Sequence, residues 1–264
     1  MKIALSPVIQ KNNFEKSGYV FLVLIPLVLL GFWKTYFSKF FGAFNSISSY
    51  MIFHFIMMAT WITMLIVQPI LIRKNKLRTH RFIGKISYFT MPLLIVSIVL
   101  MINLDKTTPA EELTFVNAQG LRDLFALVAC YIIAILNRRE RDIHARAMIG
   151  TGIAILDPII ARVMNFIVIP ILMSIHPNPD DRVGSLIKTI FYIVKYGAVL
   201  VPLVILIYRD RNQNARGRWI FPSLLVIYGV SHLLLVYQNF ILGKPVHIPV
   251  LDDFVRWFQA LPLT

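Results

Sequence analysis

Two histidines that open long apolar stretches are the residues whose type and position could do chemistry. His80 stands at the beginning of one stretch and His144 at the beginning of another. An imidazole nitrogen is a common iron ligand, and two histidines on facing helices can hold a haem through its axial positions. The sequence therefore makes His80 and His144 candidate haem ligands, with haem b as the candidate cofactor.

Two further histidines lie deeper inside apolar stretches. His54 and His232 fall toward the opposite ends of their stretches from the positions that His80 and His144 occupy. Four histidines in two layers resemble the plan of the transmembrane ascorbate-reducible b-type cytochromes. That resemblance implies a redox protein, and it rests on residue placement alone.

An arginine accompanies each of the two opening histidines. Arg81 directly follows His80, and Arg146 comes shortly after His144. A guanidinium group there could bind a haem propionate, or it could bind lipid or isoprenoid phosphate with no haem present. A third interpretation is that both histidines are hydrated residues at the membrane surface. The pattern leaves these alternatives open.

Polar side chains also form a stripe along one apolar stretch. His54, Trp61 and Gln68 are each seven residues apart, which is close to two helical turns. They therefore share one face of a helix. Polar groups inside a membrane are costly, so we expect this face to point at other helices and to take part in ligand binding.

Two cations lie inside later apolar stretches, Arg162 and Lys195. At a rise of 1.5 Å per residue, Lys195 falls roughly 13 Å and Arg162 and His232 roughly 15 Å from the outer helix ends, with His54 at roughly 6–9 Å. The four residues could line a cavity for an anion. The alternative is structural, with Arg162 paired to Asp123 or Asp157 and Lys195 extended toward the interface.

The composition places the whole chain in a membrane. The chain has 264 residues, of which 57% are hydrophobic and 15% charged, whereas soluble domains are about 45–50% apolar. The net charge of +14 follows from basic loops, so nucleic acid is not an expected partner. The single cysteine, Cys130, excludes an intramolecular disulfide and a cysteine-based metal centre.

Seven stretches have the length of a transmembrane helix. They cover residues of about 18–37, 50–72, 82–103, 121–137, 145–173, 186–208 and 218–242. The fold class is therefore all-α, a polytopic bundle of seven transmembrane helices in a single domain. Pro158 and Pro170 predict a kink or tilt in the fifth span.

The loop charges predict the orientation. Every second loop is basic, at residues 73–81, 138–146 and 209–218, and the other side holds Glu111, Glu112, Asp180 and Asp181. By the positive-inside rule the N-terminus is cytoplasmic and the C-terminus is outside. We expect a multi-pass protein of the bacterial inner membrane. Residues 243–264 then form an outer interfacial tail, either a short helix at 249–260 or a loosely ordered segment.

Two short motifs carry a family resemblance. Residues 77–85 read LRTHRFIGK and residues 142–149 read DIHARAMI. They resemble the bacterial membrane family catalogued as domain of unknown function 2306, whose members read His-Arg-Trp-Leu-Gly-Arg and His-Arg-Arg-Trp-Met. The similarity covers roughly residues 50–170. The motif positions are occupied by His54, His80, Arg81, Gly84, His144, Arg146, Met148 and Arg162.

The chain departs from those motifs at Phe82, which replaces a tryptophan, and at Ala145 and Ala147. The family has no established reaction, so the resemblance implies a membrane fold and a set of residues. The leading functional hypothesis is a membrane protein that binds a small ligand or a b-type haem. The alternatives are a non-enzymatic accessory subunit of a larger membrane complex and an organic-anion transporter. Membrane lipids are expected partners in each case.

Overall fold

The computed structural model describes residues 13–42, 47–104, 110–176, 181–211 and 216–237, with residues 253, 257, 260 and 261 of the tail. Every regular element in these residues is a helix. The expectation of an all-α protein is therefore confirmed. Most of the predicted tail helix at 249–260 lies outside the described residues, as do the side chains of the predicted acidic loops.

The first pass of the chain is broken. It consists of a short 3-10 helix η1 (Asn13–Lys16), α1 (Ser17–Phe21), α2 (Leu24–Phe32), a π-helix η2 (Trp33–Phe37) and α3 (Ser38–Gly42). The axis bends by 53° between Ser17–Gly31 and Trp33–Phe40. Phe32, at the bend, has left the α-helical conformation.

Three long helices follow, α4 (Ser49–Arg73), α5 (Leu77–Leu104) and α6 (Ala110–Leu136). The Ser48 hydroxyl caps α4 by accepting a hydrogen bond from the Met51 amide at 3.3 Å. Asn75 turns the chain between α4 and α5 with a left-handed φ of 56°, a conformation that asparagine tolerates better than most residues.

The second half of the chain continues the helical hairpins. It comprises α7 (Arg141–Ala154), α8 (Leu156–Val163), a π-helix η4 (Met164–Val168), α9 (Ile169–Ile175), α10 (Asp181–Asp210) and α11 (Ile220–Val236). The expected irregularity of the fifth span is present at two places. The chain breaks between α7 and α8 at Ile155, just before Pro158, and it widens into η4 just before Pro170.

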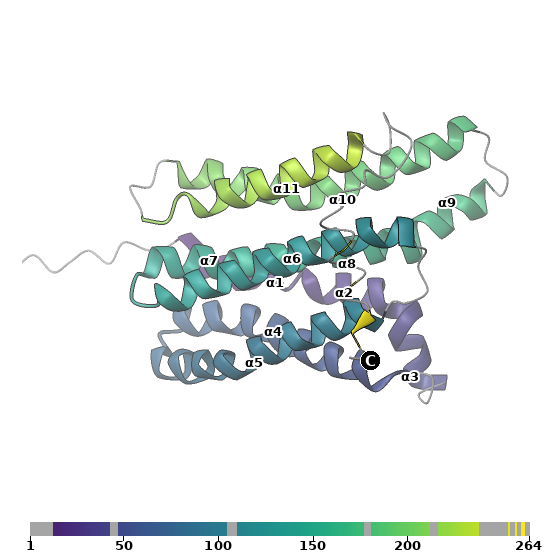
Figure 1. Ribbon diagram of the computed structural model, residues 1–264. Helices are drawn as coiled ribbons and strands as arrows, with labels where there is room; N and C mark the ends of the chain where they lie inside the picture. The colour runs from purple at the N-terminus through teal and green to yellow at the C-terminus, as the bar shows by residue number, and fades with distance from the viewer. Residues whose placement is uncertain are drawn as a thin grey trace, which may run out of the picture.

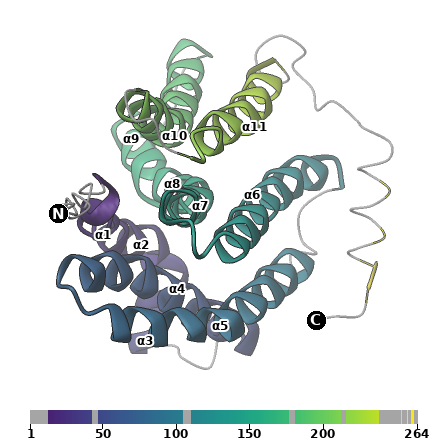
Figure 2. The ribbon, with the colours of Figure 1, turned by 90° about the vertical axis from the view of Figure 1, so that its left-hand side faces the viewer.

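The helices lie in three layers along a common direction (Figure 1). One layer holds α4 and α5, a middle layer holds α6 with α7 and α8, and a third holds α10 and α11. The end view places α7 and α8 at the centre, with α2 on one side and α6 on the other (Figure 2). Eight of the nine residues from Arg146 to Ala154 in α7 are buried, and Met148 is the exception. Most of α7 is therefore enclosed by the surrounding helices, and several of its residues belong to the apolar core.

Several helices could cross a membrane. Five are long and apolar enough, and the bent pair Ser17–Gly31 and Trp33–Phe40 would make six. Helix α11, with 17 residues, is a shorter apolar helix. The structure is therefore that of a protein with several helices able to span a membrane. The seventh span and the orientation stay predictions from the sequence.

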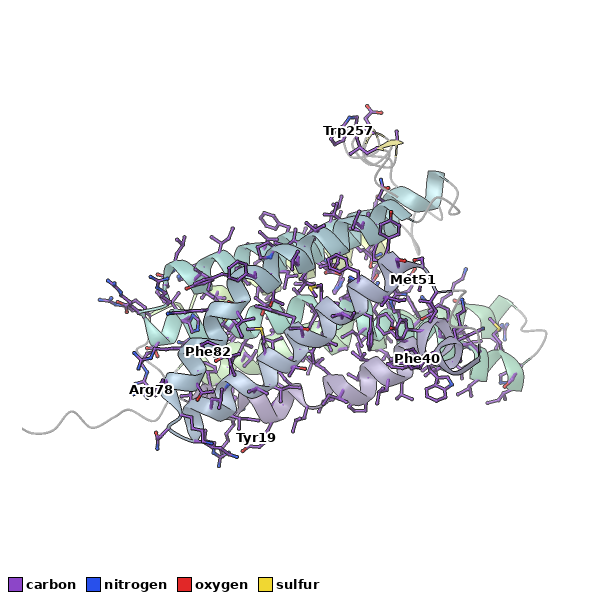
Figure 3. All side chains as sticks on the ribbon, turned by 90° about the horizontal axis from the view of Figure 1, so that it is seen from below. Tyr19, Phe40, Met51, Arg78, Phe82 and Trp257 are labelled. Atoms are coloured by element: carbon purple, nitrogen blue, oxygen red, sulfur yellow. The ribbon has the colours of Figure 1, made fainter. Side chains whose placement is uncertain are left out.

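The outer surface of the bundle suits lipid. Large apolar side chains point away from it, including Leu136 at 78% exposed and Phe89 at 76%. The connections α4–α5, α6–α7 and α10–α11, which carry the arginines and lysines, gather at one end (Figure 1). Arg78 marks this basic end in Figure 3, and Phe40 and Met51 mark the opposite end.

Candidate functional site

The two opening histidines lie near each other at the basic end. His80 is in the first turn of α5 and His144 is in the first turn of α7. The two rings are within electrostatic range of one another, and His80 also lies beside the backbone of Gln68 in α4. The structure therefore brings together residues of three helices. The two furthest apart in the sequence, Gln68 and His144, are separated by 76 positions.

The ring of His144 has a fixed orientation. Its Nδ1 lies 2.9 Å from the carbonyl oxygen of Ala134 in α6. A carbonyl can only accept, so Nδ1 carries the hydrogen and the Nε2 of the neutral ring has a lone pair. This is the arrangement in which a protein prepares a histidine as a metal ligand.

Buried polar atoms without hydrogen-bond partners occur on α4 and α5 at this end of the bundle and one to two turns further along α4. They are both amide atoms of Gln68, the Nδ1 of His80 and the indole nitrogen of Trp61, each unpartnered among the described residues. Buried polar atoms nearly always have a partner in native proteins, which can be a water or a ligand. We call Trp61, Gln68, His80 and His144 the histidine site.

A glycine and a tyrosine border the histidine site. A Cβ at Gly84 would lie 3.7 Å from the Nε2 of Gln68. Because Gly84 has no side chain, it does not cover this side of the Gln68 amide. The Tyr131 ring packs edge-on to Trp61 with 5.7 Å between ring centroids. Ser87 gives its proton to the Gly84 carbonyl at 2.6 Å, so the Tyr131 hydroxyl donates to Ser87 at 3.2 Å. This wall is fully hydrogen-bonded, unlike the amide of Gln68.

The two neighbouring arginines differ in their environment. Arg81 is exposed, and its Nε donates to the Leu77 carbonyl of its own helix at 3.3 Å. Arg146 is completely buried and holds Asp210 of α10 with two hydrogen bonds of 2.5 and 2.6 Å. It also donates to two backbone carbonyls, those of Asp142 and Arg216. The donors of Arg146, expected to bind a ligand, are therefore occupied by the protein.

A second polar group lies where α6, α8, α10 and α11 meet. Arg122 forms ion pairs with Asp123 at 2.8 Å and with Asp157, and it donates to Ser231 at 2.9 Å. Lys195 lies 4.0 Å from Asp157 and donates to Gln119. We call Arg122, Asp123, Asp157 and Lys195 the charged cluster. Its two cations and two carboxylates balance, and each side chain is nearly buried.

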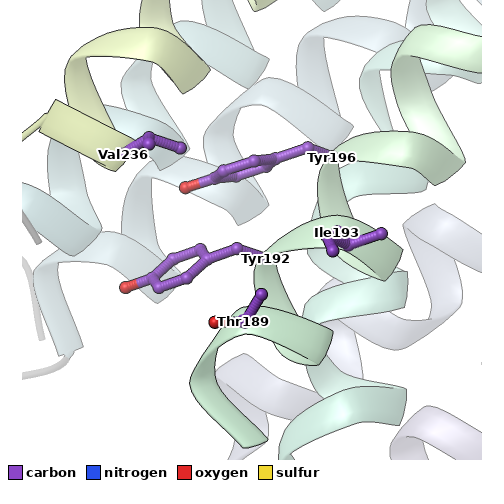
Figure 4. A pocket seen from close by; sticks show the side chains of 5 residues that line it. All are labelled: Thr189, Tyr192, Ile193, Tyr196 and Val236. Carbon is purple, nitrogen blue, oxygen red and sulfur yellow. The ribbon is translucent and has the colours of Figure 1, made fainter. Parts of the chain in front are cut away.

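His232 adjoins the charged cluster rather than a metal site. Its ring stacks on Tyr196 with 4.0 Å between centroids, and both of its nitrogens are buried without hydrogen-bond partners among the described residues. Tyr196 also lines a pocket of about 290 Å³ with Thr189, Tyr192, Ile193 and Val236 (Figure 4). Tyr196 therefore contacts both His232 and this pocket.

His54 and Arg162 form a separate pair. The His54 Nδ1 lies 3.1 Å from the Ser97 hydroxyl, and its ring is within electrostatic range of Arg162. The four residues expected to line one cavity thus fall into two groups, because Lys195 contacts α6 and α8 and His232 stacks on α10, whereas Arg162 lies over Phe32 of α2. Asp157, the alternative partner expected for Arg162, pairs with Arg122 and Lys195 instead.

Several residues of these sites escaped prediction from the sequence. Asp210 stands at a helix end, where polar residues are common, Ser231 lies within the predicted seventh span, and Gln119 precedes the predicted fourth span. Arg122 is visible in the sequence at the beginning of that span, and its pairing with Asp157 depends on the packing of α6 against α8. Within the described residues no group of three or more His, Cys, Asp or Glu side chains could hold a metal ion.

These features define the class of protein, an all-helical protein with several helices able to cross a membrane and with polar groups buried between them. No family profile, no curated protein and no solved structure matches the chain. The resemblance to the family catalogued as domain of unknown function 2306 therefore stays a prediction from the two motifs.

Proposed function

We propose that this chain is a seven-span protein of the bacterial inner membrane that binds a b-type haem at the histidine site. The N-terminus and the basic loops would be cytoplasmic and the C-terminus would be outside. Helix α11 would supply the seventh span. At 1.5 Å per residue its 17 residues cover about 25 Å, slightly less than a bilayer core of roughly 30 Å.

The pairing of His80 with His144 carries the proposal. The two rings come from different helices and lie within electrostatic range, and the Ala134 carbonyl leaves the Nε2 of His144 with its lone pair. Two imidazole nitrogens are what a six-coordinate haem iron requires of the protein. Gln68, whose backbone lies beside His80, adds an unpartnered amide, and Trp61 adds an unpartnered indole on the same face of α4.

The remaining side chains would have positioning roles. His144 would be held in register by Ala134, and the exposed guanidinium of Arg81 could bind a propionate at the membrane surface. Arg146 would act indirectly, since its ion pair with Asp210 ties the beginning of α7 to the end of α10. A bound haem would supply one-electron redox chemistry.

An absorption spectrum tests this proposal. The protein would be extracted in mild detergent and recorded oxidised and then reduced with dithionite. We expect a Soret band with sharp reduced α and β bands, lost in His80→Ala and in His144→Ala. His176→Ala is the matched control, because His176 is exposed at the opposite end of the bundle. A featureless spectrum with no extractable haem would refute haem binding.

Cysteine labelling tests the orientation separately. The native Cys130 is buried at 3% exposed and gives a low background. A cysteine placed at Arg139 should react with a membrane-impermeant maleimide only after the cells are opened. A cysteine placed at Ser174 should react in intact cells. The reverse pattern would invert the proposed topology while leaving the haem proposal untouched.

A further inference from the structure

Arg162, which is half-buried, differs from the other two arginines in the interior of the bundle. Arg122 and Arg146 each hold a carboxylate, whereas no ion pair or side-chain hydrogen bond links Arg162 to any described residue. Its guanidinium lies over the Phe32 ring, with 4.7 Å between the Cζ atom and the ring centroid. Arginine keeps its charge in proteins, so its donors need an acceptor even within the membrane.

The fold holds Arg162 firmly in this position. A Cβ at Gly31 would lie 3.3 Å from both the Ile159 carbonyl oxygen and the Arg162 Cβ, so α2 packs closely on α8. The chain then bends by 53° after Gly31, which brings Phe32 against the guanidinium. A π-helix follows on each side, η2 after Phe32 and η4 after Val163. Such wide turns occur frequently at functional sites.

His54 adds a second group with a defined tautomer. The Ser97 hydroxyl gives its proton to the Leu94 carbonyl at 2.7 Å, so it must accept from the His54 Nδ1 at 3.1 Å. The neutral ring therefore has its lone pair on Nε2. His54 is five residues into α4, about 7–8 Å from the helix end, which is the depth of lipid headgroups and their linkages.

We propose that Arg162 and His54 form a binding site for an oxyanion, a phosphate or carboxylate group, at the end of the bundle opposite the basic loops. Arg162 would donate two hydrogen bonds to the oxygens, and the His54 Nε2 would accept from a hydroxyl of the same ligand, such as a glycerol hydroxyl of a phospholipid headgroup. The Phe32 ring would hold the guanidinium plane in place. The oxyanion could belong to an anionic phospholipid or to a small soluble anion.

Thermal unfolding in nanodiscs distinguishes these sources. The protein would be placed in phosphatidylcholine discs, and phosphatidylglycerol or millimolar inorganic phosphate would be added as the probe. We expect phosphatidylglycerol to raise the unfolding temperature of the wild type, with an affinity about tenfold weaker in Arg162→Gln, since a charge-assisted bidentate contact is lost. Arg182→Gln is the matched control, because Arg182 is exposed at the same end.

Each outcome decides the proposal. Stabilisation by phosphatidylglycerol alone identifies a lipid headgroup, and stabilisation by inorganic phosphate identifies a soluble oxyanion. No stabilisation by either probe, or equal stabilisation of the wild type and Arg162→Gln, overturns it. If Arg162→Gln fails to fold, Arg162→Lys and His54→Gln replace it, and both must weaken binding severalfold while Arg182→Gln does not.

Discussion

The charged cluster and the histidine site differ in whether their buried polar groups have partners within the protein. In the charged cluster, Arg122 and Lys195 are neutralised within the protein by Asp123 and Asp157. In the histidine site, the Gln68 amide, the Trp61 indole nitrogen and the His80 Nδ1 are buried without hydrogen-bond partners among the described residues. Buried charges must be paired for the fold to be stable, whereas uncharged groups can await a ligand at a smaller cost. The charged cluster therefore stabilises the fold, whereas the histidine site has the unpartnered groups that the proposed haem binding would use.

The largest effect is expected when the charged cluster loses one partner. Asp157→Leu leaves Arg122 and Lys195 facing each other with one carboxylate fewer, and unpaired buried charges cost about 3–5 kcal/mol. We expect a large fall in the midpoint of heat- or SDS-induced unfolding. An unchanged midpoint would mean that the cluster is open to water and is not a structural element.

The buried pair of Arg146 and Asp210 provides a sharper version of this test. Arg146→Met and Asp210→Leu should each destabilise the protein by about 3–5 kcal/mol, since each leaves one charge unpaired. The double variant should recover much of that loss, because no charge remains buried. A double-mutant cycle on unfolding midpoints measures the coupling. Additive losses would contradict the direct ion pair.

Two glycines that pack against α4 test the space around the histidine site. A Cβ at Gly18 would meet the Ile66 carbonyl oxygen at 2.5 Å, so Gly18→Ala forces α1 and α4 apart and should cost about 1–3 kcal/mol. A Cβ at Gly84 meets only the Gln68 amide, at 3.7 Å. Gly84→Ala should therefore leave the unfolding midpoint unchanged or slightly raised. Equal losses in both variants would show that the histidine site is tightly filled.

Gln68→Leu separates stability from binding. The amide has no partner to lose, so its removal should leave the stability of the ligand-free protein unchanged or raise it by about 1 kcal/mol. The same variant should lower the haem content at purification. Asp157→Leu is the contrasting variant, with lost stability as its first effect. A strong destabilisation by Gln68→Leu would show that the amide stabilises the fold.

The smallest effect is expected at the surface. Arg216 and Glu140 form an ion pair of 3.4 Å between side chains that are 77% and 49% exposed. Solvent screens such a pair, so Glu140→Gln should not measurably shift the unfolding midpoint. A clearly lower midpoint would show that exposed and buried ion pairs contribute alike to the stability of this protein.

Helix positions were largely predictable because an apolar run must be as long as the membrane core. The predicted span at 50–72 matches α4 (Ser49–Arg73), and the span at 186–208 lies within α10 (Asp181–Asp210). The predicted fourth span, 121–137, begins eleven residues after α6 does at Ala110. Hydropathy marks the apolar part of a helix and not the polar turns that precede it, so helix beginnings were the least predictable feature.

The sequence predicted which residues take part in the candidate site, and it predicted only some of the contacts between them. The stripe of Trp61 and Gln68, and the nearness of His80 to His144, follow from helical periodicity and from helices that begin at the same end. The separation of Lys195 from Arg162 did not follow, because periodicity fixes a residue's angle on its own helix and not which neighbour that angle faces.

The sequence by itself determined that the chain is all-helical with several apolar helices, since the cost of unpaired backbone groups in lipid leaves few other structures. Only the tertiary structure decided which charges are neutralised. It paired Arg146 with Asp210 and Arg122 with Asp157, across 64 and 35 residues of chain, and left Arg162 over Phe32. An ion pair depends on distances of a few ångströms between side chains of different helices, and helix packing alone sets those distances.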